Sequence, residues 1–120
     1  MLFLHGFPEF WYSWRYQIKE FSRDYWTVAI DMRGYGDSDK PSGFQNYELK
    51  LLTDDVVKVI KALGREKCIL VSHDWGGIVG WNMSEFHPNM IEKYIVMNVP
   101  PAWLIRKLLA THTKQFLKFW

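Results

Sequence analysis

The chain is 120 residues long, with 48% hydrophobic residues, 18% aromatic residues and a formal net charge of +2. This length and apolar content suit one small domain with a hydrophobic core, and they exclude a disordered chain. The sequence has no basic block that would mark a nucleic-acid surface, and no apolar run near the roughly 18 residues that span a bilayer.

Short apolar runs alternate along the chain with segments whose apolar residues recur at helical spacing. The apolar runs predict β-strands at residues 1–4, 26–30, 67–71 and 91–97. The helical patterns cover residues 10–21, 47–63 and 76–86, and residues 102–120 are amphipathic and basic, which indicates one or two further helices. Gly64 suits a helix C-cap, and the step from His87 to Pro88 ends the third helix.

This alternation predicts an α/β fold, in which a parallel sheet is covered by helices on both faces. Ligands of such sheets bind at the carboxyl ends of the strands, so the loops after Leu4, Ile30, Val71 and Met97 should form the functional edge. The first strand starts at residue 1, and we therefore expect the sheet to have further strands outside this sequence.

A nucleophile elbow is predicted where the third strand meets the third helix. Ser72 and Gly76 are small residues placed two before and two after Asp74, as the sharp strand-to-helix turn requires, and Gly77 lets the helix pack closely. The turn would lift the Asp74 carboxylate above the sheet, beside a helix amino end that favours negative charge. An aspartate is ionised at neutral pH and needs no base to attack an electrophilic carbon. The alternative is that Asp74 is only an N-cap of the helix.

The His-Gly-Phe-Pro segment at residues 5–8 follows the first predicted strand. Gly6 would let the backbone approach a reacting atom, and Pro8 would stiffen the exit from the loop. The backbone N–H groups of Phe7 and Trp75 could then point at one spot above the apex carboxylate and form an oxyanion hole. We interpret His5 as structural, a ring that ties the loop down, and not as the catalytic base.

Residues 31–39 form a loop rich in glycine and aspartate. The loop lacks the lysine followed by Ser or Thr of a Walker-type phosphate loop, so we predict a structural role, with Asp31 paired to Arg33. The single cysteine, Cys68, lies in an apolar run and should pack as a small hydrophobe. Four tryptophans are predicted to be core residues and not a ligand cage: Trp11, Trp14, Trp26 and Trp81.

Three segments carry a family resemblance: His-Gly-Phe-Pro-Glu at 5–9, Asp-Met-Arg-Gly-Tyr-Gly at 31–36 and Ser-His-Asp-Trp-Gly-Gly at 72–77. In order and spacing they resemble epoxide hydrolases of the α/β-hydrolase superfamily, most of all the animal epoxide hydrolase 3 and 4 group. The resemblance implies a partial α/β-hydrolase fold, with N-terminal strands and the C-terminal half missing. Residues 1–101 would form the partial core, and residues 102–120 would begin the lid, or cap. The strands should lie in the order second, first, third, fourth.

By this resemblance, Asp74 would attack an epoxide carbon to give an ester that water hydrolyses to a diol. Phe7 and Trp75 would supply the oxyanion hole, and the supporting residues would be His5, Gly6, Pro8, Gly76 and Gly77. The substrate would be a small apolar epoxide, with water as co-substrate and with no cofactor, metal or nucleic acid. Relatives also use lid tyrosines and a late acid and histidine. We find no counterparts of these groups and expect the 120 residues alone to be inactive.

Two other readings stay open. A haloalkane dehalogenase shares the aspartate nucleophile but usually has a polar halide-binding residue where this chain has Phe7, and a fluoroacetate dehalogenase would have Arg in place of Trp75. A non-catalytic fragment or interaction module is the alternative from another class. The sequence leaves open the physiological epoxide, its stereochemistry, the oligomeric state and the compartment. Membrane association would need an upstream segment; relatives are often bound to the endoplasmic reticulum membrane or cytoplasmic.

Overall fold

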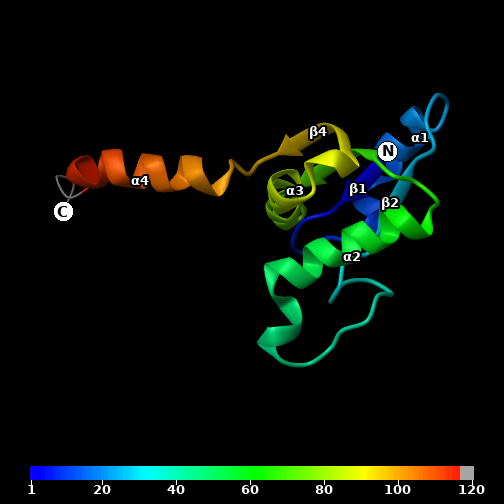
Figure 1. Cartoon of the computed structure of the whole chain (residues 1–120), viewed down its shortest axis with the longest axis horizontal. Helices are drawn as coiled ribbons and strands as arrows, with labels where there is room; N and C mark the ends of the chain where they lie inside the picture. The colour runs from blue at the N-terminus through cyan, green and yellow to red at the C-terminus, as the bar shows by residue number, and fades with distance from the viewer. Residues whose placement is uncertain (117–120) are drawn as a thin grey trace.

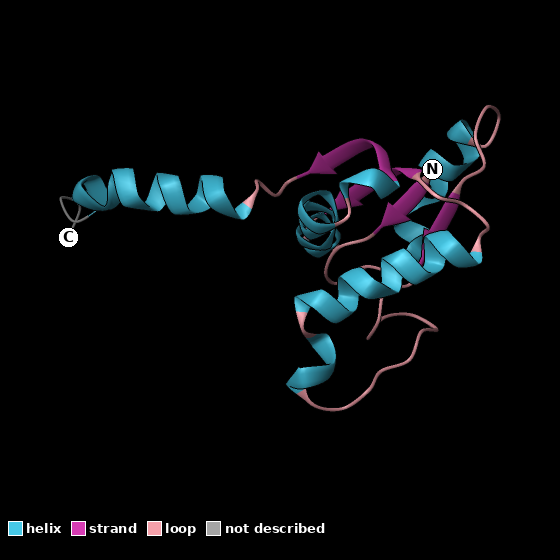
Figure 2. Cartoon of the chain, viewed as in Figure 1, coloured by secondary structure: helices cyan, strands magenta, loops and turns pink. Residues whose placement is uncertain are grey.

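Four parallel strands form a single sheet at the centre of the molecule (Figures 1 and 2). The computed structural model describes residues 1–116, with side chains described as far as Thr111. The strands are β1 (Leu2–Leu4), β2 (Val28–Ile30), β3 (Cys68–His73) and β4 (Ile91–Met97). Their order in the sheet is β2-β1-β3-β4, which confirms the predicted order and places the elbow strand β3 beside β1.

Helices connect the strands in the predicted alternation. They are the 3-10 helix Trp11–Trp14, α1 (Arg15–Phe21), the 3-10 helix Phe44–Tyr47, α2 (Leu49–Ala62), α3 (Trp75–Phe86), the 3-10 helix Pro88–Met90 and α4 (Ala102–Phe116). Gly64 follows α2 with a φ of +68°, and its N–H donates to the carbonyl of Lys61, so the predicted glycine cap is confirmed. The first predicted helix begins as a 3-10 turn and becomes α-helical only at Arg15.

Successive residues of β1 pack on opposite faces of the sheet. Leu2 and Leu4 contribute to a core shared with α2 and α3, whereas Phe3 packs with Trp14 on the other face. All three residues of β1 are buried, and a buried Leu or Phe side chain typically contributes roughly 1.5–3 kcal/mol. Helices therefore pack on both faces of the sheet at β1, as the alternation of strands and helices predicts, whereas Ile95 and Met97 of β4 are exposed.

The helix α4 extends away from the sheet in Figure 1. Residues 102–116 form this single helix, and the rest of the predicted helical segment, residues 117–120, lies outside the described residues. No helix within residues 1–116 is long and apolar enough to cross a membrane. The assignment of residues 102–120 to a lid stays a prediction.

Two of the four tryptophans predicted to be core residues are exposed. Trp14 is 4% exposed, whereas Trp11 is 41% exposed and Trp26 54% exposed. Trp11 opens the 3-10 turn, and only Trp14, three residues later, packs against the sheet. Trp26 precedes β2, and the guanidinium of Arg65 lies over its ring at 5.1 Å. Trp81 is half-buried and donates its indole N–H to the carbonyl of Val99.

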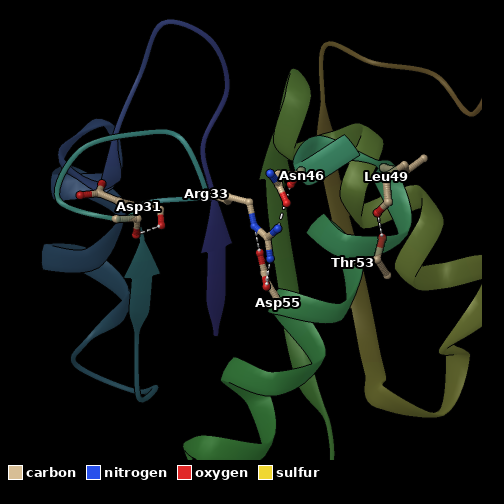
Figure 3. Close-up of polar contacts among 7 residues, drawn as sticks. Asp31, Arg33, Asn46, Leu49, Thr53 and Asp55 are labelled. Atoms are coloured by element: carbon tan, nitrogen blue, oxygen red, sulfur yellow. Dashed lines mark hydrogen bonds and ion pairs between the residues drawn. The ribbon is translucent and has the colours of Figure 1, made fainter. Parts of the chain in front are cut away.

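The predicted pair of Asp31 and Arg33 is wrong. Arg33 forms a two-pronged ion pair with Asp55 of α2, through N–O distances of 2.7 and 2.8 Å, and its third nitrogen donates to the carbonyl of Asn46 at 2.8 Å (Figure 3). The carboxylate of Asp31 accepts backbone N–H groups of Trp11 and Asp37 instead. Each carboxylate oxygen of Asp31 accepts a backbone N–H group, and Arg33 pairs instead with Asp55, 22 residues further along the chain. The loop has the expected structural role, but the ion pair of Arg33 connects it to α2.

Candidate active site

Asp74 is the single residue between the end of β3 and the start of α3. Its backbone adopts φ +50° and ψ −120°, a region that non-glycine residues rarely occupy and that costs on the order of 1–3 kcal/mol. Its side chain makes no capping hydrogen bond to α3. The structure therefore gives a sharp strand-to-helix turn at Asp74, and the role of its carboxylate stays a prediction.

Two glycines bring the segments of the site together. A Cβ on Gly76 would lie 2.5 Å from the carbonyl oxygen of Leu4 and 2.6 Å from that of His5, so only glycine lets α3 start against the end of β1. The Gly76 N–H donates to the same His5 oxygen at 3.0 Å. A Cβ on Gly6 would lie 2.6 Å from the Cβ of Asp74. The missing side chains thus allow the loop after β1 to touch the elbow.

Gly77 completes this close packing one residue further along α3. A Cβ there would lie 2.2 Å from a methyl group of Val99, so the helix approaches the segment that follows β4. The predicted close packing of this helix on the sheet is observed.

The loop after β1 delivers a backbone N–H group to the carboxylate of Asp74. The Phe7 N–H donates to Oδ1 of Asp74 at 3.0 Å. Hydrogen bonds from the Phe7 amide, and next from the Trp75 amide, lower the pKa of Asp74 because they stabilise its charged form. Residues 67 positions apart in the sequence thus contribute to one anionic site, and the carboxylate is ionised at neutral pH.

His5 anchors the loop after β1, and both of its ring nitrogens form hydrogen bonds. The ring is fully buried, and its Nε2 accepts the Met32 N–H at 3.0 Å. Because Nε2 accepts, Nδ1 carries the hydrogen and donates to the carbonyl of Gly6 at 2.8 Å. The edge of the ring meets Tyr35, with 4.8 Å between ring centroids. These contacts fit a structural ring that ties the loop after β1 to the loop after β2.

Glu9 forms a second clamp on the loop, one that sequence reasoning missed. Its Oε2 accepts the Gly6 N–H at 2.9 Å and lies 3.2 Å from Nδ1 of His73. The loop is therefore fastened to the last residue of β3, and the His73 ring faces Glu9. The sequence feature that could have indicated this contact is the spacing of three residues between Gly6 and the Glu9 carboxylate, which is typical of a turn. Between them stands Pro8, which follows Phe7 through a cis peptide bond.

The side chains of Phe7 and Trp75 face solvent. Phe7 is 64% exposed and Trp75 is 51% exposed, and the Phe7 amide donates to the Asp74 carboxylate. A cavity of about 880 Å³ lies elsewhere, between β2 and α2, and Asp74 does not line it. We place the site at Asp74 on the chemistry of the contacts and not on cavity size. No group of three or more residues able to hold a metal ion occurs within residues 1–116.

A parallel sheet with a strained strand-to-helix turn after a central strand is the arrangement of α/β-hydrolases. Residues 1–117 match the family model described as alpha/beta hydrolase fold. The chain belongs to this family.

Within this family, the chain is similar to epoxide hydrolases. It is 52% identical over 120 residues to epoxide hydrolase 1 of Caenorhabditis elegans, covering 100% of this chain and 30% of that protein. It is 48% identical over 118 residues to human epoxide hydrolase 4, covering 98% of this chain and 33% of that protein. A crystal structure of a Bacillus megaterium epoxide hydrolase superimposes with a TM-score of 0.89 at 47% identity, covering 96% of this chain and 40% of that one. The chain thus spans about a third of the length of these curated relatives.

Proposed function

We propose that this chain carries the nucleophile of an epoxide hydrolase and that Asp74 is that nucleophile. The observation that carries the proposal is the Asp74 carboxylate at a strained apex, with the Phe7 amide 3.0 Å from its Oδ1. The names of the similar proteins supply the substrate class, since they are called epoxide hydrolases.

The reaction we propose has two steps. A carboxylate oxygen of Asp74 bonds to an epoxide carbon, the C–O bond of the ring breaks, and the resulting alkoxide takes up a proton. A water molecule then attacks the ester carbonyl, the C–O bond to the substrate breaks, the diol leaves, and the carboxylate returns with release of one proton to solvent. In the second step, negative charge develops on the carbonyl oxygen, where the amides of Phe7 and Trp75 would stabilise it; one such donor is typically worth about 2.7–4 kcal/mol.

The surroundings of Asp74 favour a small apolar substrate. Phe7 and Trp75, whose backbone amides act on the carboxylate, carry exposed aromatic rings, and such rings bury apolar groups well. A halide leaving group is less suited to this position, because Phe7 offers no polar side-chain atom to bind a halide ion. The arrangement therefore supports an epoxide in preference to a haloalkane.

The second step needs a base, and two nearby histidines are already committed. Both nitrogens of His5 are hydrogen-bonded within the loop, and Nδ1 of His73 faces Glu9. A positioned general base commonly contributes about 10²–10⁴-fold to rate. We propose that the 120 residues by themselves form the ester slowly and do not turn over.

Incubation with a reactive aryl epoxide, followed by intact mass measurement and peptide mapping, tests the proposal. We expect one adduct, located on Asp74, and no adduct in Asp74→Asn. The exposed Asp37 provides a matched control, because Asp37→Asn should label like the parent. Labelling of many carboxylates, or equal labelling of Asp74→Asn, would contradict the assignment of Asp74 as the nucleophile. Multiple turnover by the bare chain would contradict the expected lack of a base.

A further inference from the structure

A buried chain of hydroxyl groups joins β4 to the two sides of the elbow. The hydroxyl of Ser72, a fully buried residue in β3, lies 2.9 Å from the hydroxyl of Tyr94 in β4. The Tyr94 hydroxyl in turn donates to the carbonyl oxygen of Gly77, in the first turn of α3, at 2.9 Å. Since Ser72 precedes Asp74 and Gly77 follows it, this hydrogen-bond chain bridges the turn that presents the carboxylate.

The direction of these hydrogen bonds is fixed by chemistry. A carbonyl oxygen only accepts, so the single hydrogen of the Tyr94 hydroxyl goes to Gly77, and Ser72 must donate to Tyr94. Burial raises the pKa of Tyr94 to about 12. The phenol therefore stays protonated and remains a donor throughout the neutral range.

The surface of α3 is shaped to admit this hydroxyl. A Cβ on Gly80 would lie 2.3 Å from the hydroxyl oxygen of Tyr94, so any side chain there would push the phenol out. The ring of Trp81 meets the Tyr94 ring edge-on, with 5.1 Å between centroids.

We propose that Tyr94 is a positioning residue for the nucleophile elbow: its hydrogen bonds to Ser72 and Gly77 hold the first turn of α3, and with it the Trp75 amide, against Asp74. The functional meaning of this role rests on the proposed function of Asp74. The backbone links the two directly, because the N–H of Gly77 donates to the carbonyl of Asp74 at 2.8 Å. A shift of Gly77 therefore moves the backbone of the apex.

The test is Tyr94→Phe in the full 120-residue chain, with the carboxyl carbons of aspartate labelled for an NMR titration. We expect the pKa of Asp74 to rise relative to the parent, because the Trp75 amide loses its alignment. Amide hydrogen exchange at Gly76 and Gly77 should accelerate by roughly tenfold, the scale of one hydrogen bond, while the strands of the sheet keep their rates. Tyr16→Phe is the matched control, because Tyr16 is 66% exposed and keeps its ring over Arg15.

Ser72→Ala removes the other end of the chain without touching the phenol, and it should shift the Asp74 titration in the same direction. An Asp74 pKa unchanged in both variants, or exchange accelerated equally across sheet and helices, would overturn the positioning role. Epoxide labelling of the parent separates the two proposals. If the parent is not labelled but the Asp74 pKa moves in Tyr94→Phe, the nucleophile assignment fails alone. If the parent is labelled and the pKa stays, the role of Tyr94 fails alone.

Discussion

Replacing Gly6 by Ala tests whether close contact between the loop and the elbow creates the anionic site. The new methyl carbon would lie 2.6 Å from the Cβ of Asp74 and 3.1 Å from Nδ1 of His73. Carbon atoms in contact normally lie about 3.5–4.0 Å apart, so the loop must retreat by roughly 1 Å. The bond from the Phe7 N–H to Asp74, now 3.0 Å, would then exceed the length of a normal hydrogen bond.

Two quantities should respond. Overpacking of this kind typically costs about 1–3 kcal/mol of unfolding free energy, which urea denaturation followed by tryptophan fluorescence measures. The pKa of Asp74 should rise, because the Phe7 amide is the first cause of its depression. An NMR titration of labelled aspartate carboxyl carbons follows this change at the residue itself.

The matched control is Gly64→Ala. Gly64 has a φ of +68°, and a methyl group added there would meet no atom within 4 Å, so the substitution strains the backbone without touching the site. We expect a stability loss of about 1–2 kcal/mol there, with the Asp74 titration unchanged. If Gly6→Ala left the Asp74 pKa at its parent value, the loop would not be the source of the depressed pKa, and the proposed oxyanion hole would lose its main support.

Three further outcomes are expected. Asp55→Asn should cost about 1.5–3 kcal/mol in urea unfolding because it breaks a partly buried, two-pronged pair with Arg33, whereas Glu20→Gln at the exposed pair with Arg23 should cost less than about 1 kcal/mol; equal costs would contradict the clamp. The pKa of Asp74 in the folded chain is lowered from its ordinary value of 3.8. The ionised carboxylate therefore stabilises the fold above pH 3.8, and this contribution is lost as the pH falls through the folded-state pKa. The difference in unfolding free energy between the parent and Asp74→Asn should shrink only in that acid range. The outer edges of β2 and β4 are unpaired among the described residues, so sedimentation should show association that rises with concentration, and a strictly monomeric chain with a sharp melt would refute this.

The features of the fold that follow local rules were predictable from the sequence. Short apolar runs predicted the strands, most clearly for β1, which is buried on both faces of the sheet. Small residues around Asp74 gave the elbow because a turn with φ +50° between β3 and α3 leaves no room for larger flanks. In both cases the physical constraint acts over a few residues, and a few residues of sequence therefore reveal it.

Features that depend on a distant partner were not predictable in this way. Asp31 is the nearest acid to Arg33 in the sequence, yet the guanidinium reaches Asp55 on α2, which local spacing cannot reveal. Helical spacing also placed Trp11 and Trp14 on one stripe, yet only Trp14 packs against Phe3 of the sheet, and Trp11 is 41% exposed. In each case the packing of separate elements decided the outcome.

Among the residues whose side chains the structure describes, Glu9, Asp31 and Asp74 accept backbone N–H groups, and that contact alone does not mark a nucleophile. Asp31 has one oxygen on the Trp11 amide and the other on the Asp37 amide, and a Cβ on Gly36 would overlap it, so it is enclosed and spent on its own loop. The Glu9 carboxylate accepts the Gly6 N–H and contacts His73, and it thereby connects the loop after β1 to β3. Asp74 differs because the same kind of amide contact occurs at a strained single-residue turn, at the carboxyl edge of the sheet, beside exposed aromatic rings. The proposed nucleophile role therefore rests on two conditions that coincide at Asp74: its carboxylate is ionised, and a strained turn presents it.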